Sequence, residues 1–331
     1  KLIYIAVFLT PLSFQLSSIL KSTDFNLAIP SEPLMVGILL FFPLKYLFEG
    51  RFDKRILTHP VSVAIAINLV WIFITSITST MPLVSFKFLV SRLWFIVAFY
   101  LIASQIFRNP EHIRTYAWMY AISLLIVILY AWYRILPFGF LNQQAAHFVV
   151  QPFYPDHTSY GAVLALMIPM FIGFVLTMKD SSLLRRVFTW IFLIVLLFAV
   201  VFSYTRAAWV SLVGAFAVFL VIRLRIRFIY LAIFGILVLG YLFSQRTQIF
   251  IALEQNRQDS SEDLVEHVKS ISNVATDVSN LERLNRWSCA WRMFKEKPLF
   301  GWGPGTYMFQ YAPFQLEREK TQISTNAATL G

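Results

Sequence analysis

Residues 187–222 read VFTWIFLIVLLFAVVFSYTRAAWVSLVGAFAVFLVI, and this stretch decides the fold. It holds two long apolar runs, 187–203 and 207–222, and Arg206 is its one charged residue. Each run approaches the ~20 apolar residues that cross a bilayer as a helix. The short sequence Tyr204-Thr205-Arg206 between the runs leaves room only for a tight turn. The stretch therefore predicts two neighbouring, antiparallel membrane helices.

The composition extends this prediction to the whole chain. Hydrophobic residues make up 58% of the 331 positions and charged residues 14%, whereas soluble domains hold about 45–50% and about 25%. The alternating ~10-residue segments of a membrane β-barrel are absent. We therefore expect an all-α, polytopic transmembrane helical bundle. The apolar runs predict nine spans, at 2–20, 33–48, 61–79, 83–106, 113–136, 159–178, 187–203, 207–222 and 228–243.

The basic residues predict how the spans are oriented. The alternate loops 49–60, 107–114, 179–186 and 223–227 together hold eleven Lys and Arg residues, and the opposite set holds only Lys21 and Arg206. Loops rich in Lys and Arg face the cytoplasm. Residues 1–243 thus form the transmembrane region, and 244–331 form a large, partly helical extracytoplasmic loop. The net charge of +11 is then mainly an anchor at the cytoplasmic leaflet, which argues against nucleic acid as a partner.

Three cations lie where this orientation disfavours them. Lys87 and Arg92 fall in the outer half of the span 83–106, and Arg206 falls at the outer end of the span 207–222. An ionisable group inside a span costs at least ~2.5–3.5 kcal/mol and usually faces a partner or a water-filled cavity. Snorkelling of the side chain to lipid phosphates is the alternative. Because no outward-facing span supplies a carboxylate, we expect a bound anion as the partner.

The extracytoplasmic loop carries a further basic and aromatic segment. Residues 281–297 predict a helix with one apolar stripe, formed by Leu284, Trp287, Trp291 and Phe294. Pro298 ends this helix, and the irregular turn GWGPG follows at 301–305. The stripe suits a membrane surface, or ordinary packing against the rest of the protein.

The loop 137–158 is rich in polar and aromatic residues, among them His147, Tyr154 and His157. Side chains of these kinds suit contacts with sugars. The alternative is that these residues only line the loop. Cys289 is the one cysteine, so disulfides and thiolate metal cages within the chain are excluded.

Three short patterns resemble the O-antigen ligase and polymerase superfamily of bacterial envelope glycan assembly. They are TRAAW at 205–209, ERLNRW at 282–287 and KPLFGWGPGTY at 297–307, the last being the most specific. The resemblance covers essentially the whole chain, and its sharp motifs lie between residues 200 and 310. It implies a GT-C-like membrane glycosyltransferase that needs no metal, cofactor or nucleotide sugar.

The resemblance also implies a substrate and a set of site residues. Glycan is expected to move from an undecaprenyl-diphosphate carrier to lipid A-core or another glycan acceptor, at the periplasmic face of the bacterial inner membrane. The carrier diphosphate is expected to lie between Arg206 and Arg283. The other candidates are Arg92, Lys87 and Arg286 for the diphosphate, and His157, Tyr154 and Trp287 for the glycan or acceptor. The family's essential histidine follows a stretch like 325–331, so it and further spans are expected beyond Gly331.

Two alternatives to ligation stay open in the sequence. A polymerase of the same superfamily joins repeat units to each other, and nothing in the chain identifies the acceptor. A transporter of lipid-linked glycan belongs to another class, in which internal repeats and broken helices at mid-membrane are common. We find no repeat between the two halves of the chain, and the unexpected cations lie at the outer face. These features favour the enzyme.

Overall fold

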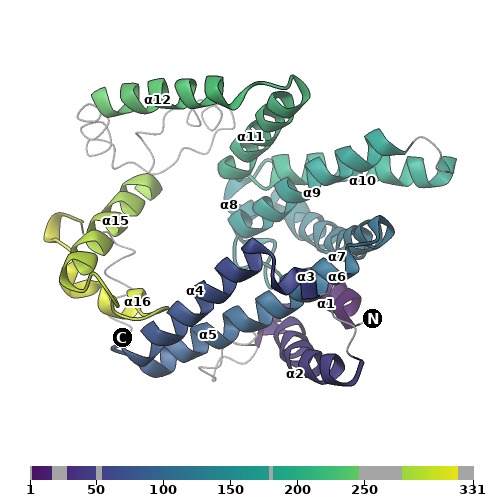
Figure 1. Ribbon diagram of the computed structural model, residues 1–331. Coiled ribbons are helices and arrows are strands. Elements are labelled where there is room, and N and C mark those ends of the chain that lie inside the picture. Colours follow the sequence, from purple (N-terminus) through teal and green to yellow (C-terminus); the bar gives the residue numbers. More distant parts are fainter. Residues whose placement is uncertain (1, 17–27, 50–53, 179–181, 246–277, 320–331) are drawn as a thin grey trace. The chain divides into compact units, whose positions relative to one another are not determined.

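The computed structural model describes residues 2–16, 28–49, 54–178, 182–245 and 278–319 (Figure 1). Regular structure in these ranges is helical, apart from one antiparallel pair of two-residue strands, β1 (Phe14–Gln15) and β2 (Ala28–Ile29). The all-α, polytopic class is therefore confirmed. Among the described residues, seven helical segments are long and apolar enough to cross a membrane: Ser31–Phe48, Pro60–Ile77, Pro82–Ile106, Pro110–Phe138, His157–Thr177, Leu183–Phe202 and Arg206–Arg223.

The seven candidates are fewer than the nine expected spans, and the first and last expected spans are not among them. In the first, the α-helix α1 (Leu2–Leu9) gives way to a 3-10 turn at Thr10–Leu12, and Ser13 is extended. Pro11 explains the break, because it lacks the N–H that would continue the α-helical ladder. The last expected span corresponds to α12 (Phe228–Ser244), whose searched apolar portion is Phe228–Val238.

The chain divides into two compact units that interleave along the sequence. Unit 1 comprises residues 1–7, 30–117 and 278–331, and unit 2 comprises residues 8–29 and 118–277. Helix α7 (Pro110–Ile135) begins in unit 1 and continues into unit 2. The boundary expected at residue 243 concerns membrane topology and stays a prediction.

Unit 1 is built on helices that lie side by side. Helix α4 (Pro60–Ile77) packs along α5 (Pro82–Ile96), which continues through a π-helical segment, Val97–Ile102, into α6 (Ala103–Ile106) (Figure 1). A proline begins both α4 and α5, where its missing N–H costs nothing. Helix α2 (Ser31–Glu49) packs on α5. The unit also contains α3 (Lys54–Leu57), α15 (Val278–Glu296), α16 (Tyr307–Gln310) and 3-10 turns at Ala312–Phe314 and Glu317–Glu319.

Unit 2 holds the larger apolar core. Helix α9 (His157–Thr177) packs against both α10 (Leu183–Phe202) and α11 (Arg206–Arg223) (Figure 1). Fully buried side chains from α7, α9 and α10 meet between them, among which Phe171 is the largest. The outward sides of these helices expose apolar residues, as a surface in contact with lipid requires. A 3-10 turn at Leu136–Phe138 and the short α8 (Gln143–Phe148) connect α7 to α9.

Candidate functional site

The turn between α10 and α11 places Arg206, and its backbone is unusual. Tyr204 has a positive φ of 50°, a conformation that costs a residue with a side chain about 1–2 kcal/mol. Tyr204 and Thr205 are both buried, and the Trp209 indole donates a hydrogen bond to the Val200 carbonyl at 3.0 Å. These contacts hold the turn in a strained but well-packed form.

Thr205 ties this turn to the beginning of α9. It stands at the N-cap of α11, yet its side chain makes no capping hydrogen bond. Its hydroxyl lies instead 2.9 Å from the carbonyl oxygen of His157 and 3.2 Å from that of Ser203. One turn along α9, a Cβ atom on Gly161 would come within 2.5 Å of the Thr205 hydroxyl oxygen. A glycine at 161 is therefore what permits the close approach of the turn to α9.

Arg206 is the first residue of α11 and is half-buried. The main-chain N–H groups of Ala208 and Trp209 bond to the Thr205 carbonyl. The beginning of a helix carries a partial positive charge of roughly half a unit, and a guanidinium there adds a full one. The end of α11 at this turn is thus electropositive and suited to an anion.

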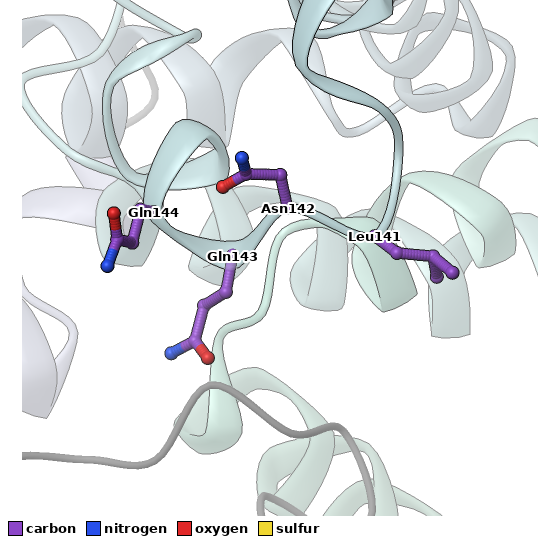
Figure 2. A pocket seen from close by; sticks show the side chains of 4 residues that line it. All are labelled: Leu141, Asn142, Gln143 and Gln144. Atoms are coloured by element: carbon purple, nitrogen blue, oxygen red, sulfur yellow. The ribbon is translucent and has the colours of Figure 1, made fainter.

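The loop between α7 and α9 forms a polar hollow of about 350 Å³ at the beginning of α8, lined by Leu141, Asn142, Gln143 and Gln144 (Figure 2). Asn142 caps α8 by accepting a hydrogen bond from the Ala145 N–H at 3.0 Å. Gln143 points away from Asn142 (Figure 2) and is only 8% exposed. Its side-chain carbonyl oxygen is buried and accepts no hydrogen bond from any residue that the structure describes. A buried acceptor of this kind suits a ligand hydroxyl or a water.

The two histidines of this loop are brought together. The rings of His147 and His157 stack, with centroids 3.9 Å apart and planes inclined by 11°. Burial lowers the pKa of His147. Asp156 caps α9 by accepting a hydrogen bond from the Ser159 N–H at 2.8 Å. Partial burial works against ionisation of that carboxyl, but the hydrogen bonds from Ser159 outweigh it and lower the pKa of Asp156.

Tyr154 is a packing residue of the same loop. It is 9% exposed, and its ring lies 5.7 Å from that of Tyr160 between centroids. Burial, together with the nearby Tyr120, raises the pKa of Tyr154. The hydroxyl therefore stays protonated and is no general base at neutral pH.

In unit 1 the turn 301–305 docks on the connection between α4 and α5. The Trp302 carbonyl accepts hydrogen bonds from the N–H and the hydroxyl of Thr80, at 3.2 and 2.9 Å. The Ser85 hydroxyl lies 2.9 Å from the Pro304 carbonyl oxygen. Gly303 has a φ of 107°, and a Cβ there would come within 2.0 Å of the Ser79 hydroxyl oxygen. The turn that carries the most specific sequence pattern is thus fixed to α5.

Four of the expected cations belong to this unit. Lys87 and Arg92 are exposed on α5, and the Arg92 guanidinium carbon lies 4.9 Å from the centroid of the Phe88 ring. Phe88 also borders Gly305, at 3.3 Å from the position of a Cβ there. The docked turn therefore lies next to the aromatic ring that Arg92 covers.

Arg283 and Arg286 are exposed along one side of α15. The Tyr307 hydroxyl donates a hydrogen bond to the Arg286 carbonyl at 3.1 Å. Trp287, the third expected glycan contact, also lies on α15 and is 75% exposed. Arg206, His157 and Tyr154 belong to unit 2. The structure thus groups the candidates within each unit, and the pairing of Arg206 with Arg283 stays a prediction.

An ion pair that sequence reasoning missed holds α15 in place. The Arg292 guanidinium forms a two-fold hydrogen-bonded pair with the Glu319 carboxylate and donates to the Phe314 carbonyl at 2.7 Å. This pairing raises the pKa of Arg292. The Cys289 thiol faces the Tyr311 carbonyl at 3.4 Å. Nothing in the sequence signals a pair of charges 27 positions apart.

A metal site does not form within the described ranges, where no three His, Cys, Asp or Glu side chains come together.

The comparison with protein families gives one match, in which residues 191–325 fit the model described as O-antigen ligase. No curated protein and no solved structure matches the chain. The matched segment contains the α10–α11 turn, α15 and the docked turn 301–305.

Proposed function

We propose that this membrane protein transfers glycan from an undecaprenyl-diphosphate carrier to an acceptor. Residues 191–325 fit the model of the O-antigen ligase family. This match confirms the resemblance to the O-antigen ligase and polymerase superfamily. Activity of the ligase or polymerase type is what the family match supports. Within it we propose ligation of O-antigen to lipid A-core by a metal-independent enzyme of the bacterial inner membrane, with its active site on the periplasmic side.

The observation that carries this proposal is the position of Arg206. It begins α11 directly after Thr205, whose hydroxyl is anchored to α9. Helix N-termini bind phosphate groups through exposed N–H groups and the helix dipole, and a guanidinium adds bidentate hydrogen bonds to phosphate oxygens. A diphosphate is the anion that a polyprenyl carrier presents at the membrane surface. The anchored turn supports Arg206 as a fixed binding group for it.

We propose that Arg283 completes the diphosphate site. It lies in the ERLNRW pattern, exposed on α15 beside Arg286. Lys87 and Arg92 extend the positive charge of unit 1 along α5. Several cations suit a diphosphate better than one, because its charge is spread over both phosphate groups.

The proposed reaction is a direct displacement at the sugar. The acceptor hydroxyl oxygen attacks the anomeric carbon and forms the new glycosidic bond, while the bond from that carbon to the carrier diphosphate breaks. The electron pair leaves with the diphosphate, and the arginines stabilise the charge that grows there. The hydroxyl proton passes to a base, which none of the described residues supplies in our proposal. Such a displacement inverts the anomeric configuration.

For the glycan we propose the loop between α7 and α9. The polar hollow lined by Leu141–Gln144 is the proposed place for sugar hydroxyls (Figure 2). His157 is half-buried, stacks on His147 and supplies the carbonyl that Thr205 binds, so the hydroxyl bond connects this loop to the turn bearing Arg206. Tyr154 supports the loop from inside. Trp287 lies on the exposed aromatic stripe of α15.

Transfer by arginine variants tests the proposal. The full-length protein in proteoliposomes receives carrier-linked glycan and lipid A-core, and both the lipid A-linked product and released undecaprenyl diphosphate are measured. Arg206→Ala and Arg283→Ala are expected to lower the rate on the order of 10²–10³-fold, as loss of one transition-state donor does. Arg223→Ala, at the opposite end of α11, is the matched control and should keep the rate.

The products separate the alternatives. Full transfer by Arg206→Ala or Arg283→Ala overturns the site. Glycan joined to glycan in place of lipid A-core identifies a polymerase. Movement of carrier-linked glycan across the bilayer without release of undecaprenyl diphosphate identifies a transporter.

A further inference from the structure

Helix α15 has two faces with different surroundings. One face packs against the segment 307–319 through buried Cys289 and Met293 and through the Arg292–Glu319 pair. The opposite face carries the aromatic stripe, which the structure leaves open: Trp287 is 75% exposed, Trp291 58% and Phe294 50%. Among the residues that the structure describes, packing therefore leaves this stripe uncovered.

The chain that follows α15 reaches a membrane-spanning surface. Phe300 stacks on Trp71 of α4, with ring centroids 6.1 Å apart. Trp71 lies six residues before the end of α4 at Ile77, which corresponds to about 9 Å along the helix axis at 1.5 Å per residue. Because α4 is a candidate membrane span, Phe300 lies at the depth of the hydrocarbon or its boundary, where tryptophan side chains collect.

Exposed apolar side chains lie on the surface of α4 and on the segment that follows α15. Around Trp71, Ile67, Val70 and Ile74 are exposed on α4. Leu299, beside Phe300, is 76% exposed. Exposed apolar side chains that continue directly from a membrane span have lipid as their neighbour. The Phe300–Trp71 contact thus fixes the segment that directly follows α15 to a surface whose solvent is the bilayer.

Two lysines at the end of α15 have the charge that lipid headgroups require. The Lys295 ammonium lies 5.9 Å from the centroid of the Trp291 ring, and the Lys297 ammonium lies 4.0 Å from that of Trp302. Long basic side chains at a membrane boundary extend toward phosphate groups while their stems cover apolar surface. Aromatic residues on one face and basic residues beside them are typical of helices that lie in the plane of the interface.

We infer that α15 and the segment 297–300 are embedded in the outer part of the bilayer, on the side where α4 ends, with Trp287, Trp291, Phe294 and Leu299 among the acyl chains. The occupant of the exposed stripe is membrane lipid. This placement holds Arg283 and Arg286 at the level of the phosphate groups, since both lie on the flank of α15 beside the stripe. The inference concerns the membrane and does not depend on glycan transfer.

Spin labels at single cysteines test this placement in the full-length protein reconstituted into vesicles. The background is Cys289→Ser, in which a hydroxyl replaces the thiol that faces the Tyr311 carbonyl. Labels replace Trp291 or Leu299 on the proposed lipid-facing side, Ser288 on the exposed flank, and Ile67 on α4 as the lipid reference. Collision of each label with oxygen is compared with collision with a water-soluble nickel chelate.

The expected result is that labels at 291 and 299 prefer oxygen, as the label at 67 does, while the label at 288 meets the chelate. Labels at 291 and 299 that meet the chelate as readily as the label at 288 overturn the inference. A second measurement needs only conservative changes. The protein is placed in phosphatidylglycerol vesicles whose acyl chains carry bromine, which quenches tryptophan emission on contact. A smaller fraction of the emission should be quenched in the Trp287→Phe/Trp291→Phe variant than in the unaltered protein. An unchanged quenched fraction also overturns the inference.

Discussion

The hydroxyl of Thr205 lies 2.9 Å from the carbonyl oxygen of His157, although 48 positions separate the two residues. The bond joins the turn that bears Arg206 to the beginning of α9. It takes the place of a helix cap, because the Thr205 side chain makes no capping bond to α11. The first residue of α11 is therefore positioned by a contact with another helix.

The close approach behind this bond predicts opposite effects of alanine at two glycines of α9. Gly161→Ala would set a Cβ within 2.5 Å of the Thr205 hydroxyl oxygen, and we expect a loss of about 1–3 kcal/mol in stability, as in other overpacked sites. Gly173→Ala is the matched control, since nothing lies within 4 Å of its Cβ position. It should gain up to about 1 kcal/mol from helix propensity. Thermal unfolding in detergent measures both, and equal midpoints would contradict the contact.

The bond itself predicts a difference between two substitutions of Thr205. Thr205→Val keeps the shape but removes the donor, which should cost about 1 kcal/mol and lower glycan transfer by misplacing Arg206. Thr205→Ser keeps the hydroxyl and should retain more of both properties. Unfolding midpoints and transfer rates are measured on the same preparations. If Thr205→Val transfers glycan as fast as the unaltered protein, the bond does not position Arg206.

The spans were predictable because apolar length alone encodes them. The runs 61–79 and 207–222, for example, correspond to α4 and α11. The first span was overestimated because hydropathy does not register that Pro11 ends the α-helix early. The aromatic stripe of α15 was also predictable, since helical spacing fixes which residues share a face.

The contacts that hold the site were not predictable from the chain. The docking of Trp302 on Thr80 joins residues more than 200 positions apart, and no local pattern reports such pairing. The same holds for Arg292 and Glu319. The close contacts of Gly161 and Gly303 were not predictable either, because they depend on side chains that lie far away in the sequence.

The docked turn predicts a coupling between Gly303 and Ser79. Gly303→Ala would bring a Cβ within 2.0 Å of the Ser79 hydroxyl oxygen at a φ of 107°. It should destabilise the protein more than Gly301→Ala, which has a positive φ but open space around its Cβ position. Adding Ser79→Gly removes the contacted side chain and should recover part of the loss. Additive effects in the double variant would show that the two positions do not meet.

The ion pair on α15 predicts that its arginines separate into two kinds. Arg292→Ala leaves the Glu319 carboxylate without its partner and should cost about 1–3 kcal/mol. Arg283→Ala changes an exposed side chain and should leave the unfolding midpoint unchanged while it lowers the transfer rate on the order of 10²–10³-fold. Midpoint and transfer rate together distinguish a structural arginine from a binding one. A large loss of stability in Arg283→Ala would remove the basis for assigning it to the diphosphate.

The lowered pKa of His147 predicts a loss of stability in mild acid. Its pKa is lowered in the folded protein, whereas in the unfolded chain it is near 6.5. Above about pH 6.5 the ring is neutral in both states, and its contribution is fully present. As the pH falls through that value the unfolded chain takes up the proton first, so stability declines until the lower folded pKa is reached. Asp156 does not contribute to the change in stability in this pH range, because its lowered pKa confines its own effect on stability to below about pH 3.9. His147→Gln should flatten the decline in unfolding midpoint between pH 7 and pH 5, and a variant that declines as steeply as the unaltered protein would rule out His147 as its source.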